Sequence, residues 1–147
     1  MIEKVECIEG GIVVDDRGHL QFCNNFDLQG MRRFYIVSNH EPQFVRAWHA
    51  HKKEAKSVFV ISGAAIIAAV KIDNWDHPDK NTPVERFVLS EKDPKMVMIP
   101  AGFANGFKTL VPDTKVIYFS TATIKESSGD DYRYDADYWD PWDVVPR

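Results

Sequence analysis

The sequence is poor in the features that mark membrane, nucleic-acid-binding and disulfide-rich proteins. Its two cysteines, Cys7 and Cys23, lack the close spacing of metal or redox motifs, so we expect two buried thiols in a reducing compartment. No stretch approaches the roughly 20 apolar residues of a membrane span, and the start of the chain lacks the basic and apolar run of a signal peptide. With 18 Lys and Arg against 22 Asp and Glu, the formal net charge is −4, which does not favour nucleic acid. These absences predict a cytoplasmic protein with neither a nucleic-acid nor a membrane partner.

Runs of helical periodicity are also scarce, whereas strand-length apolar runs are frequent. The 147 residues, 44% of them hydrophobic, suffice for one domain spanning residues 1–147. Turn-forming residues separate the runs, which favours an all-β sandwich or barrel. The predicted strands contain Ile12-Val14, Leu20-Cys23, Phe34-Val37, Phe44-Trp48, Val58-Ile61, Ala64-Ile72, Phe87-Leu89, Met96-Ile99 and Lys115-Phe119.

Three other segments complete the organisation of the chain. Short helices are expected only in Phe26 to Met31 and in the C-terminal segment, residues 130–147. The polar stretch from Asn74 to Pro83 is predicted to be an exposed hairpin loop. The C-terminal segment places five Tyr and Trp residues among six aspartates, which is too aromatic for a disordered tail. We expect it to dock on the barrel, as a lid over the core or as a dimer contact.

The segment from Val45 to Lys56 carries the most chemical information. If residues 46–51 form a regular strand, His49 and His51 share one face with Ala47. The opposite face then carries Arg46, Trp48 and Ala50. Imidazole titrates near neutrality and also coordinates divalent metals, so the pair predicts either acid–base catalysts or metal ligands.

These residues resemble the cupin superfamily, which implies a jelly-roll β-barrel. The first cupin motif has His-x-His, a carboxylate a few residues later, and a glycine that closes the next strand. The stretch from His49 to Gly63 is similar to it. Its second motif is similar to the stretch from Ile99 to Phe107. At the positions where metal-binding cupins have a ligand carboxylate and a ligand histidine, this sequence has Lys56 and Asn105. An ammonium repels a divalent cation, so the resemblance implies chemistry without a metal or other cofactor.

Within that superfamily the chain resembles the dTDP-4-dehydrorhamnose 3,5-epimerase family. The similarity includes an Asp-x-Arg-Gly turn containing Arg17, a strand from Val45 to His49, and the Ile-Pro-x-Gly-Phe-Ala-x-Gly-Phe signature from Ile99 to Phe107. It continues through Val116-Ile117-Tyr118 and, loosely, the segment from Tyr138 to Trp142. The resemblance implies an isomerase acting on a nucleotide-linked 4-keto-6-deoxyhexose in polysaccharide biosynthesis, with dTDP as the expected nucleotide.

The first half of the chain also resembles a sister group, the dTDP-sugar 3,4-ketoisomerases. The similarity lies in Arg33-Phe34-Tyr35-Ile36 and in His49-Ala50-His51-Lys52. The epimerases usually have glutamine at the position of His51, and they have a catalytic tyrosine where this sequence has Ile124. His51 therefore favours a 3,4-keto shift, while the overall coverage favours C3/C5 epimerisation, and both outcomes stay open.

Both outcomes begin by removing a proton next to the C4 ketone. We expect His49 to be the base and Lys56 to stabilise the resulting enolate. His51 is the candidate for a second proton transfer through an enediol. Tyr35 and Tyr118 are candidate second acids, although each is also explained as a core aromatic residue with its hydroxyl satisfied at the rim.

The diphosphate of the substrate requires cationic partners, because guanidinium groups bind phosphate oxygens in bidentate fashion. Arg46 and Arg17 are the candidates matched to the family, and Arg33 is a further candidate for which a solvated surface charge is the favoured explanation. In a regular strand Arg46 would face away from His49, so its role depends on a bulge. Asn105 either binds a sugar hydroxyl or caps a turn.

Two alternatives and one assembly are also predicted. A metal-dependent, dioxygenase-like cupin would use His49, His51 and Glu54, with Glu54 as a substitute carboxylate. A degenerate enzyme would hold the nucleotide sugar without catalysis. The resemblance implies a homodimer, and the N-terminal segment, about residues 1–25, is expected to cross between subunits.

Overall fold

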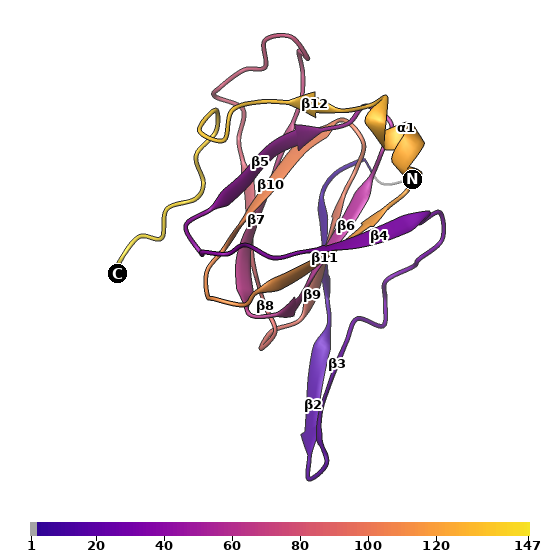
Figure 1. Ribbon diagram of the computed structural model, residues 1–147, viewed down its shortest axis with the longest axis vertical. Helices are drawn as coiled ribbons and strands as arrows, with labels where there is room; N and C mark the ends of the chain where they lie inside the picture. Colours follow the sequence, from indigo (N-terminus) through magenta and orange to yellow (C-terminus); the bar gives the residue numbers. More distant parts are fainter. Residues whose placement is uncertain (1–2) are drawn as a thin grey trace.

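The computed structural model describes residues 3–147 as twelve short strands and one helix (Figure 1). Within these residues no helix is long and apolar enough to cross a membrane. The elements are β1 (Glu6–Glu9), β2 (Gly11–Asp15), β3 (Gly18–Phe22), β4 (Arg33–Val37), β5 (Val45–Ala50), β6 (Lys56–Ser62), β7 (Ala64–Lys71), β8 (Glu85–Ser90), β9 (Lys95–Ile99), β10 (Phe103–Thr109), β11 (Lys115–Ser120), α1 (Ile124–Ser128) and β12 (Tyr132–Arg133).

Ten of the strands form two five-stranded antiparallel sheets. One sheet has the order β1-β9-β6-β11-β4 and the other has the order β12-β5-β10-β7-β8. The remaining strands, β2 and β3, pair only with each other, as a hairpin that projects from the body in Figure 1. The predicted all-β, two-sheet architecture is confirmed, as is the hairpin loop between β7 and β8.

Strand alternation sorts the apolar side chains into two clusters. The first lies between the sheets, because it combines Val58 and Val116 of one sheet with Ile67 and Phe107 of the other. The second lies on the outer face of the β5-β10-β7 sheet. The C-terminal segment covers that face with Trp139 and Trp142, which are 3% and 4% exposed. The expected docking of this segment on the barrel is therefore confirmed.

Trp48 joins the second cluster to the C-terminal segment. Its ring is fully buried and contacts Trp139 edge-on, with the ring centroids 5.4 Å apart. Its indole N–H also donates to the Trp139 carbonyl oxygen at 3.1 Å. A buried indole N–H needs such a partner, so this bond fixes where the C-terminal segment lies against the sheet.

Several local predictions are wrong. Residues 26–31 form turns rather than a helix, and α1 ends before the C-terminal segment begins. The helix begins where it does because Thr123 and Glu126 form a capping box. The strands at Glu6–Glu9, Phe103–Thr109 and Tyr132–Arg133 were not among those predicted. The cysteines are not buried, because Cys7 is exposed and Cys23 is half-buried.

The turn between β6 and β7 requires the glycine that closes the first cupin-like motif. Gly63 has φ +84°, and a Cβ there would lie 2.2 Å from Oγ1 of Thr114. Any other residue would be strained both by its backbone conformation and by this contact. The turn thereby sets the register of β7, which pairs with β10 and supports one wall of the barrel.

Candidate active site

Inside the barrel, two stacked tyrosines and a lysine lie together beside the apolar core. Tyr35 of β4 pairs with Tyr118 of β11, and their rings are parallel with centroids 5.2 Å apart. The Lys56 ammonium donates to the Tyr35 hydroxyl at 2.9 Å and lies over both rings. The three predicted residues are therefore brought together, on strands β4, β11 and β6 that neighbour one another.

Burial dominates the ionisation of this group. It raises the pKa of both Tyr35 and Tyr118, so the phenols are protonated and able to donate. Burial also lowers the pKa of Lys56, an effect that the Glu54 carboxylate opposes. A lysine in such a setting is a directed positive charge in a site that largely excludes water.

Strand β5 is irregular, and the irregularity changes which residues face the barrel interior. Trp48 and Ala50 belong to the outer cluster, so alternation turns His49 inward. The pairing with β10 then shifts, so that His49 is opposite Asn105 but Arg46 is opposite Phe107, a member of the inner cluster. Cross-strand partners project to the same side of a sheet.

The predicted facing of two residues is corrected by this register shift. Arg46 shares a side with His49, and Ala47 packs against the outer cluster, the reverse of the regular alternation. A close approach makes the shift possible: a Cβ on Gly106 would lie 2.4 Å from the Cβ of Ala47. The bulge on which a role for Arg46 depended is therefore present.

His49 is half-buried beside several charged groups. Burial lowers its pKa, and the positive charges of Arg133 and Lys56 lower it further. The imidazole is therefore neutral at physiological pH and able to accept a proton. Asn105, opposite it on β10, is 5% exposed and donates its side-chain N–H to the His49 carbonyl oxygen at 3.3 Å. Asn105 thus helps to hold this part of β5.

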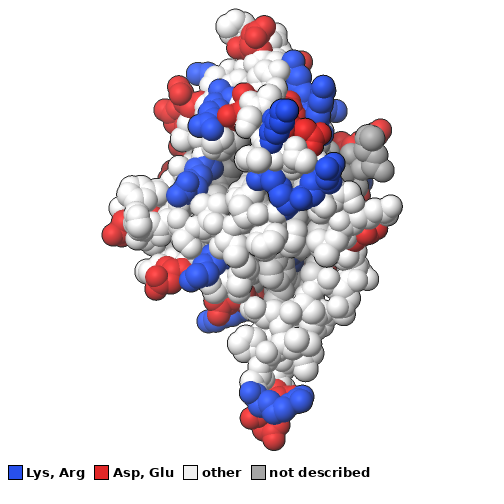
Figure 2. All heavy atoms as spheres, turned by 45° about the vertical axis from the view of Figure 1, so that its right-hand side comes forward, with Lys and Arg blue, Asp and Glu red and all other residues white. Residues whose placement is uncertain are grey.

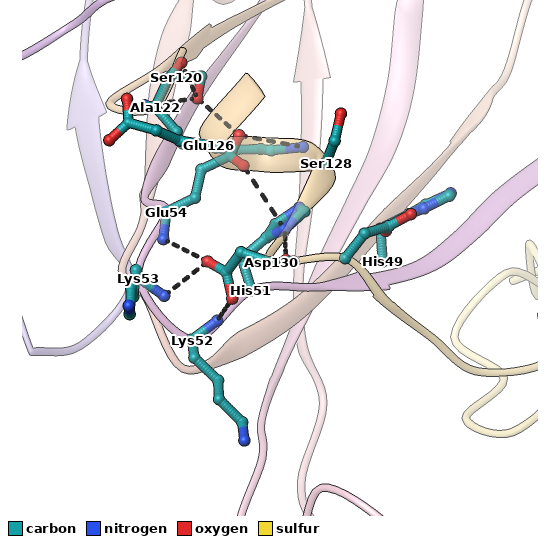
Figure 3. Close-up of polar contacts among 12 residues, drawn as sticks. His49, His51, Lys52, Lys53, Glu54, Ser120, Ala122, Glu126, Ser128 and Asp130 are labelled. Carbon is teal, nitrogen blue, oxygen red and sulfur yellow. Dashed lines mark hydrogen bonds and ion pairs between the residues drawn. The ribbon is translucent and has the colours of Figure 1, made fainter. Parts of the chain in front are cut away.

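His51 lies beyond the end of β5, in a loop that is organised by Asp130. The Asp130 carboxylate accepts the backbone N–H groups of Lys52, Lys53 and Glu54 at 2.8, 2.8 and 3.1 Å (Figure 3). Although burial opposes its charge, these donors hold the pKa of Asp130 below its usual range. The carboxylate therefore fixes the path of the chain between the two histidines and β6.

Asp130 also fixes the orientation of the His51 ring. Its backbone carbonyl lies 2.5 Å from Nδ1 of His51, and a carbonyl can only accept, so Nδ1 carries a proton. Nε2 of the neutral ring then has a lone pair, and it is buried with no hydrogen-bond partner among residues 3–147. Figure 3 shows His49 lying apart from this cluster, so the two imidazoles do not share one strand face as predicted.

Glu54 lies buried among cationic and hydroxyl groups that come from distant parts of the sequence. Its side chain is fully buried, and its Oε2 accepts from Ser120 at 2.6 Å and from Arg33 at 3.3 Å. The Lys56 ammonium is 3.9 Å from the same oxygen. Arg33, which is partly exposed, is thus paired with a buried carboxylate and also donates to the Ala122 carbonyl oxygen. Motif comparison indicated Glu54 only as a possible metal ligand, and gave no signal for Asp130 or Ser120.

The other predicted arginines lie at the surface. Arg46 donates to the Asn39 side chain at 2.7 Å, and Arg17 lies at the tip of the β2–β3 hairpin paired with Asp15. A cavity of about 1220 Å³ opens where β6 and β10 begin, with walls that include Lys53, Lys56, Trp75 and Phe103. Lys56 therefore lies in the cavity wall and also contacts Tyr35 and Tyr118.

The side chains offer no set of ligands for the metal-dependent alternative. Across the described part of the chain, no three His, Cys, Asp or Glu side chains are grouped so as to hold a metal ion. Glu54 faces the cationic groups of Arg33 and Lys56, which a divalent metal would have to displace. The residues present therefore do not fit the three-ligand site that this alternative needs.

The fold and this interior cluster define a class of protein, an all-β barrel enzyme with acid–base groups between its two sheets. Comparison with known proteins identifies the family: the chain belongs to the dTDP-4-dehydrorhamnose 3,5-epimerase family, whose model matches residues 1–140. The predicted class of enzyme, an isomerase of the dTDP-sugar epimerase and isomerase type, is thereby confirmed.

Individual relatives agree with this assignment. A probable low-salt glycan biosynthesis epimerase of Haloferax volcanii, Agl13, is 26% identical over 74% of this chain and 71% of its own length. The RmlC epimerase of Mycobacterium tuberculosis has a similar structure, with a TM-score of 0.76 and 19% identity over 98% of this chain and 76% of that chain. QdtA, a sugar 3,4-ketoisomerase from Thermoanaerobacterium thermosaccharolyticum solved with TDP, gives a TM-score of 0.67 and 17% identity over 94% and 93%. These structures confirm the cupin-type fold.

Proposed function

We propose that this protein isomerises a dTDP-linked 4-keto-6-deoxyhexose by removing a proton from the carbon next to the ketone. The observation that carries the proposal is the group of Lys56, Tyr35 and Tyr118. The Lys56 ammonium donates to the Tyr35 hydroxyl over two stacked rings, and His49 lies on the facing sheet. The family supports the substrate class, because its model describes a dTDP-4-dehydrorhamnose epimerase.

The proton transfer is assigned to His49 and the stabilisation of charge to Lys56. The lowered pKa of His49 keeps the imidazole neutral, which is the form that accepts a proton. Loss of that proton places negative charge on the ketone oxygen. A fixed ammonium in a buried setting stabilises an enolate far more than it would in water. Tyr35 and Tyr118 are protonated at neutral pH and can return a proton to the sugar ring.

The anionic end of the substrate is assigned to arginines outside the barrel. Arg46 shares a side with His49, and its guanidinium is at the surface. We assign the diphosphate to it, because a guanidinium binds phosphate oxygens in bidentate fashion. Arg17 contributes to this subsite only if the β2–β3 hairpin approaches a site in a second subunit. We assign Arg33 to positioning the Glu54 carboxylate, with which it pairs. We assign Asn105 to positioning β5, through its hydrogen bond to the His49 carbonyl oxygen.

One observation favours ketone migration over epimerisation as the outcome. The buried Nε2 of His51 has a lone pair without a hydrogen-bond partner within the described residues, and we assign the second proton transfer to it. The position where the epimerases have a catalytic tyrosine is Ile124, which is 68% exposed at the start of α1. A 3,4-keto shift needs a second proton carrier, whereas it does not need that tyrosine.

Proton NMR of dTDP-4-keto-6-deoxyglucose, incubated with the protein in deuterated water, tests the proposal. We expect a 3-keto product that carries deuterium at C4, with deuterium at C3 only in recovered 4-keto substrate. Inverted configuration at C3 or C5, with deuterium at that carbon and no ketone migration, would instead establish an epimerase. Tight binding of the sugar nucleotide without any exchange would contradict the proposed catalysis and favour a protein that only holds the nucleotide sugar.

We further propose that residues 1–147 form a single domain and that two copies pair through the N-terminal segment, about residues 1–25. Residues 1 and 2 of that segment lie outside the described residues. Along the projecting hairpin, Val13, Val14 and Leu20 are 53%, 72% and 63% exposed. Figure 2 shows the shaft of this arm free of charged side chains, which gather at its tip. Exposed apolar residues on a projecting hairpin mark a surface that a partner covers.

Replacing Leu20 with aspartate is expected to shift the protein from dimer to monomer. The change places a charge on the apolar arm, where burial against a second copy would cost several kcal/mol. Light scattering after size-exclusion chromatography measures the mass. Val144→Asp, at a similarly exposed residue of the C-terminal segment, is the matched control. A wild-type protein of monomer mass at high concentration would contradict the proposed pairing.

A further inference from the structure

The buried carboxylate of Glu54 divides its two oxygens between different partners. Oε2 accepts from Ser120 and Arg33 and lies 3.9 Å from the Lys56 ammonium. Oε1 lies 3.5 Å from Nδ1 of His51, outside hydrogen-bond geometry. It is buried without a hydrogen-bond partner in the part of the chain that the structure describes. One oxygen is thus anchored, while the other faces the histidine.

Leaving a carboxylate oxygen buried and without a hydrogen bond is costly, so the position of Glu54 needs an explanation. The histidine that faces Oε1 also has a buried atom without a hydrogen-bond partner, Nε2 of His51. The two unpartnered atoms are related, because one can accept a proton and the other carries negative charge. If Nε2 accepts a proton, the ring becomes positive, and that charge arises beside Oε1.

We propose that Glu54 is a positioning residue that acts through His51, as the counter-ion of the imidazolium that forms when Nε2 takes up a proton. This inference rests on the proposed function, in which His51 carries the second proton. Arg33 and Ser120 hold the carboxylate in place, and Asp130 holds the ring by its Nδ1–H. The ring can then gain and lose a proton at Nε2 without changing its orientation.

The net effect of the surroundings on His51 depends on where each charge lies. The charged and titratable groups that surround it are Glu54 of the same loop, Asp130 after α1, His49 of β5, Lys56 of β6 and Arg33 of β4. Arg33 and Lys56 approach Oε2, on the side of the carboxylate that does not face the ring. Glu54 thus places an anionic oxygen 3.5 Å from Nδ1 of the ring, while the two cations reduce its effect.

Three variants test the proposal by NMR titration of the His51 ring, which requires no substrate. Glu54→Gln keeps the shape of the side chain but removes its charge, so we expect the midpoint of the ring titration to fall by about one pH unit. Arg33→Met removes a cation that offsets Glu54, so the midpoint is expected to rise. Glu85→Gln, at an exposed carboxylate of β8, is the control and should leave the midpoint unchanged.

Turnover supplies a second readout that a purely structural role would not move. In Glu54→Gln, C3 deuterium exchange, assigned to His49, should fall only as far as Lys56 is affected by the loss of its neighbouring anion. Product formation, which also needs the imidazolium of His51, should fall about tenfold more than exchange. Equal losses of exchange and product would contradict a role specific to His51.

The outcomes separate this inference from the proposed function. If wild type neither exchanges nor converts the sugar nucleotide, the proposed function fails, while the His51 titrations still decide whether Glu54 is the counter-ion. Identical midpoints in wild type and Glu54→Gln would overturn the inference even in an active enzyme. If Glu54→Gln does not fold, a midpoint that rises in Arg33→Met supports the inference, and one that is unchanged or falls overturns it.

Discussion

Replacing His49 with asparagine is expected to reduce deuterium exchange at the carbon next to the ketone by about 10²- to 10⁴-fold, the usual contribution of a general base. Asparagine retains a polar side chain of similar reach but cannot accept the proton. His49 is half-buried, and its side chain accepts none of the hydrogen bonds that hold β5, so the fold should be preserved. Proton NMR in deuterated water measures the exchange.

The pH dependence of the wild-type rate gives a second check on His49. Because burial and nearby cations lower the pKa of His49, the neutral base persists below the ordinary histidine range near 6.5. The exchange rate should therefore stay level as the pH falls to about 6.5 and decline only at lower pH. His77→Asn, at an exposed histidine of the β7–β8 loop, should exchange like wild type. Exchange at the wild-type rate in His49→Asn would remove His49 from the mechanism.

Sequence reasoning reached the architecture and part of the site because both depend on local patterns. Apolar alternation predicts strands, and the turn at Gly63 follows from a residue that tolerates positive φ. Lys56, Tyr35 and Tyr118 were predicted from motifs that resemble the family, and the structure places each of them on a strand. Their mutual contact follows from the order of β4, β11 and β6, which motif spacing alone does not supply.

The parts that sequence reasoning missed depend on contacts between distant segments or on irregular backbone. Asp130 organises the loop of His51 from 79 residues away, and in the sequence it is one of six aspartates in the aromatic C-terminal segment. The facing of Arg46 depends on a register shift that the sequence pattern does not reveal. Glu54 looked like a substitute metal ligand, because the cations that surround it come from β4 and β6. In each case the decisive partner is remote in sequence.

Replacing Lys56 with methionine is expected to lower kcat for proton exchange by about 10²- to 10³-fold, comparable to losing one donor to a developing oxyanion. Methionine fills much of the same buried space but supplies no charge and no donor for the Tyr35 hydroxyl. Because the enolate charge arises only as the proton leaves, the loss should fall on kcat and leave KM within a few-fold. Initial rates over a range of sugar nucleotide concentrations separate the two constants.

Two controls give the Lys56→Met result its meaning. Lys115→Met removes an exposed lysine at the start of β11, so it should leave kcat unchanged if the effect belongs to the buried ammonium rather than to overall charge. Loss of Lys56 also removes a cation that lowers the pKa of His49. The acid decline of the residual exchange should therefore move to higher pH. A kcat unchanged in Lys56→Met, or a loss confined to KM, would show that Lys56 binds the ground state and does not stabilise the enolate.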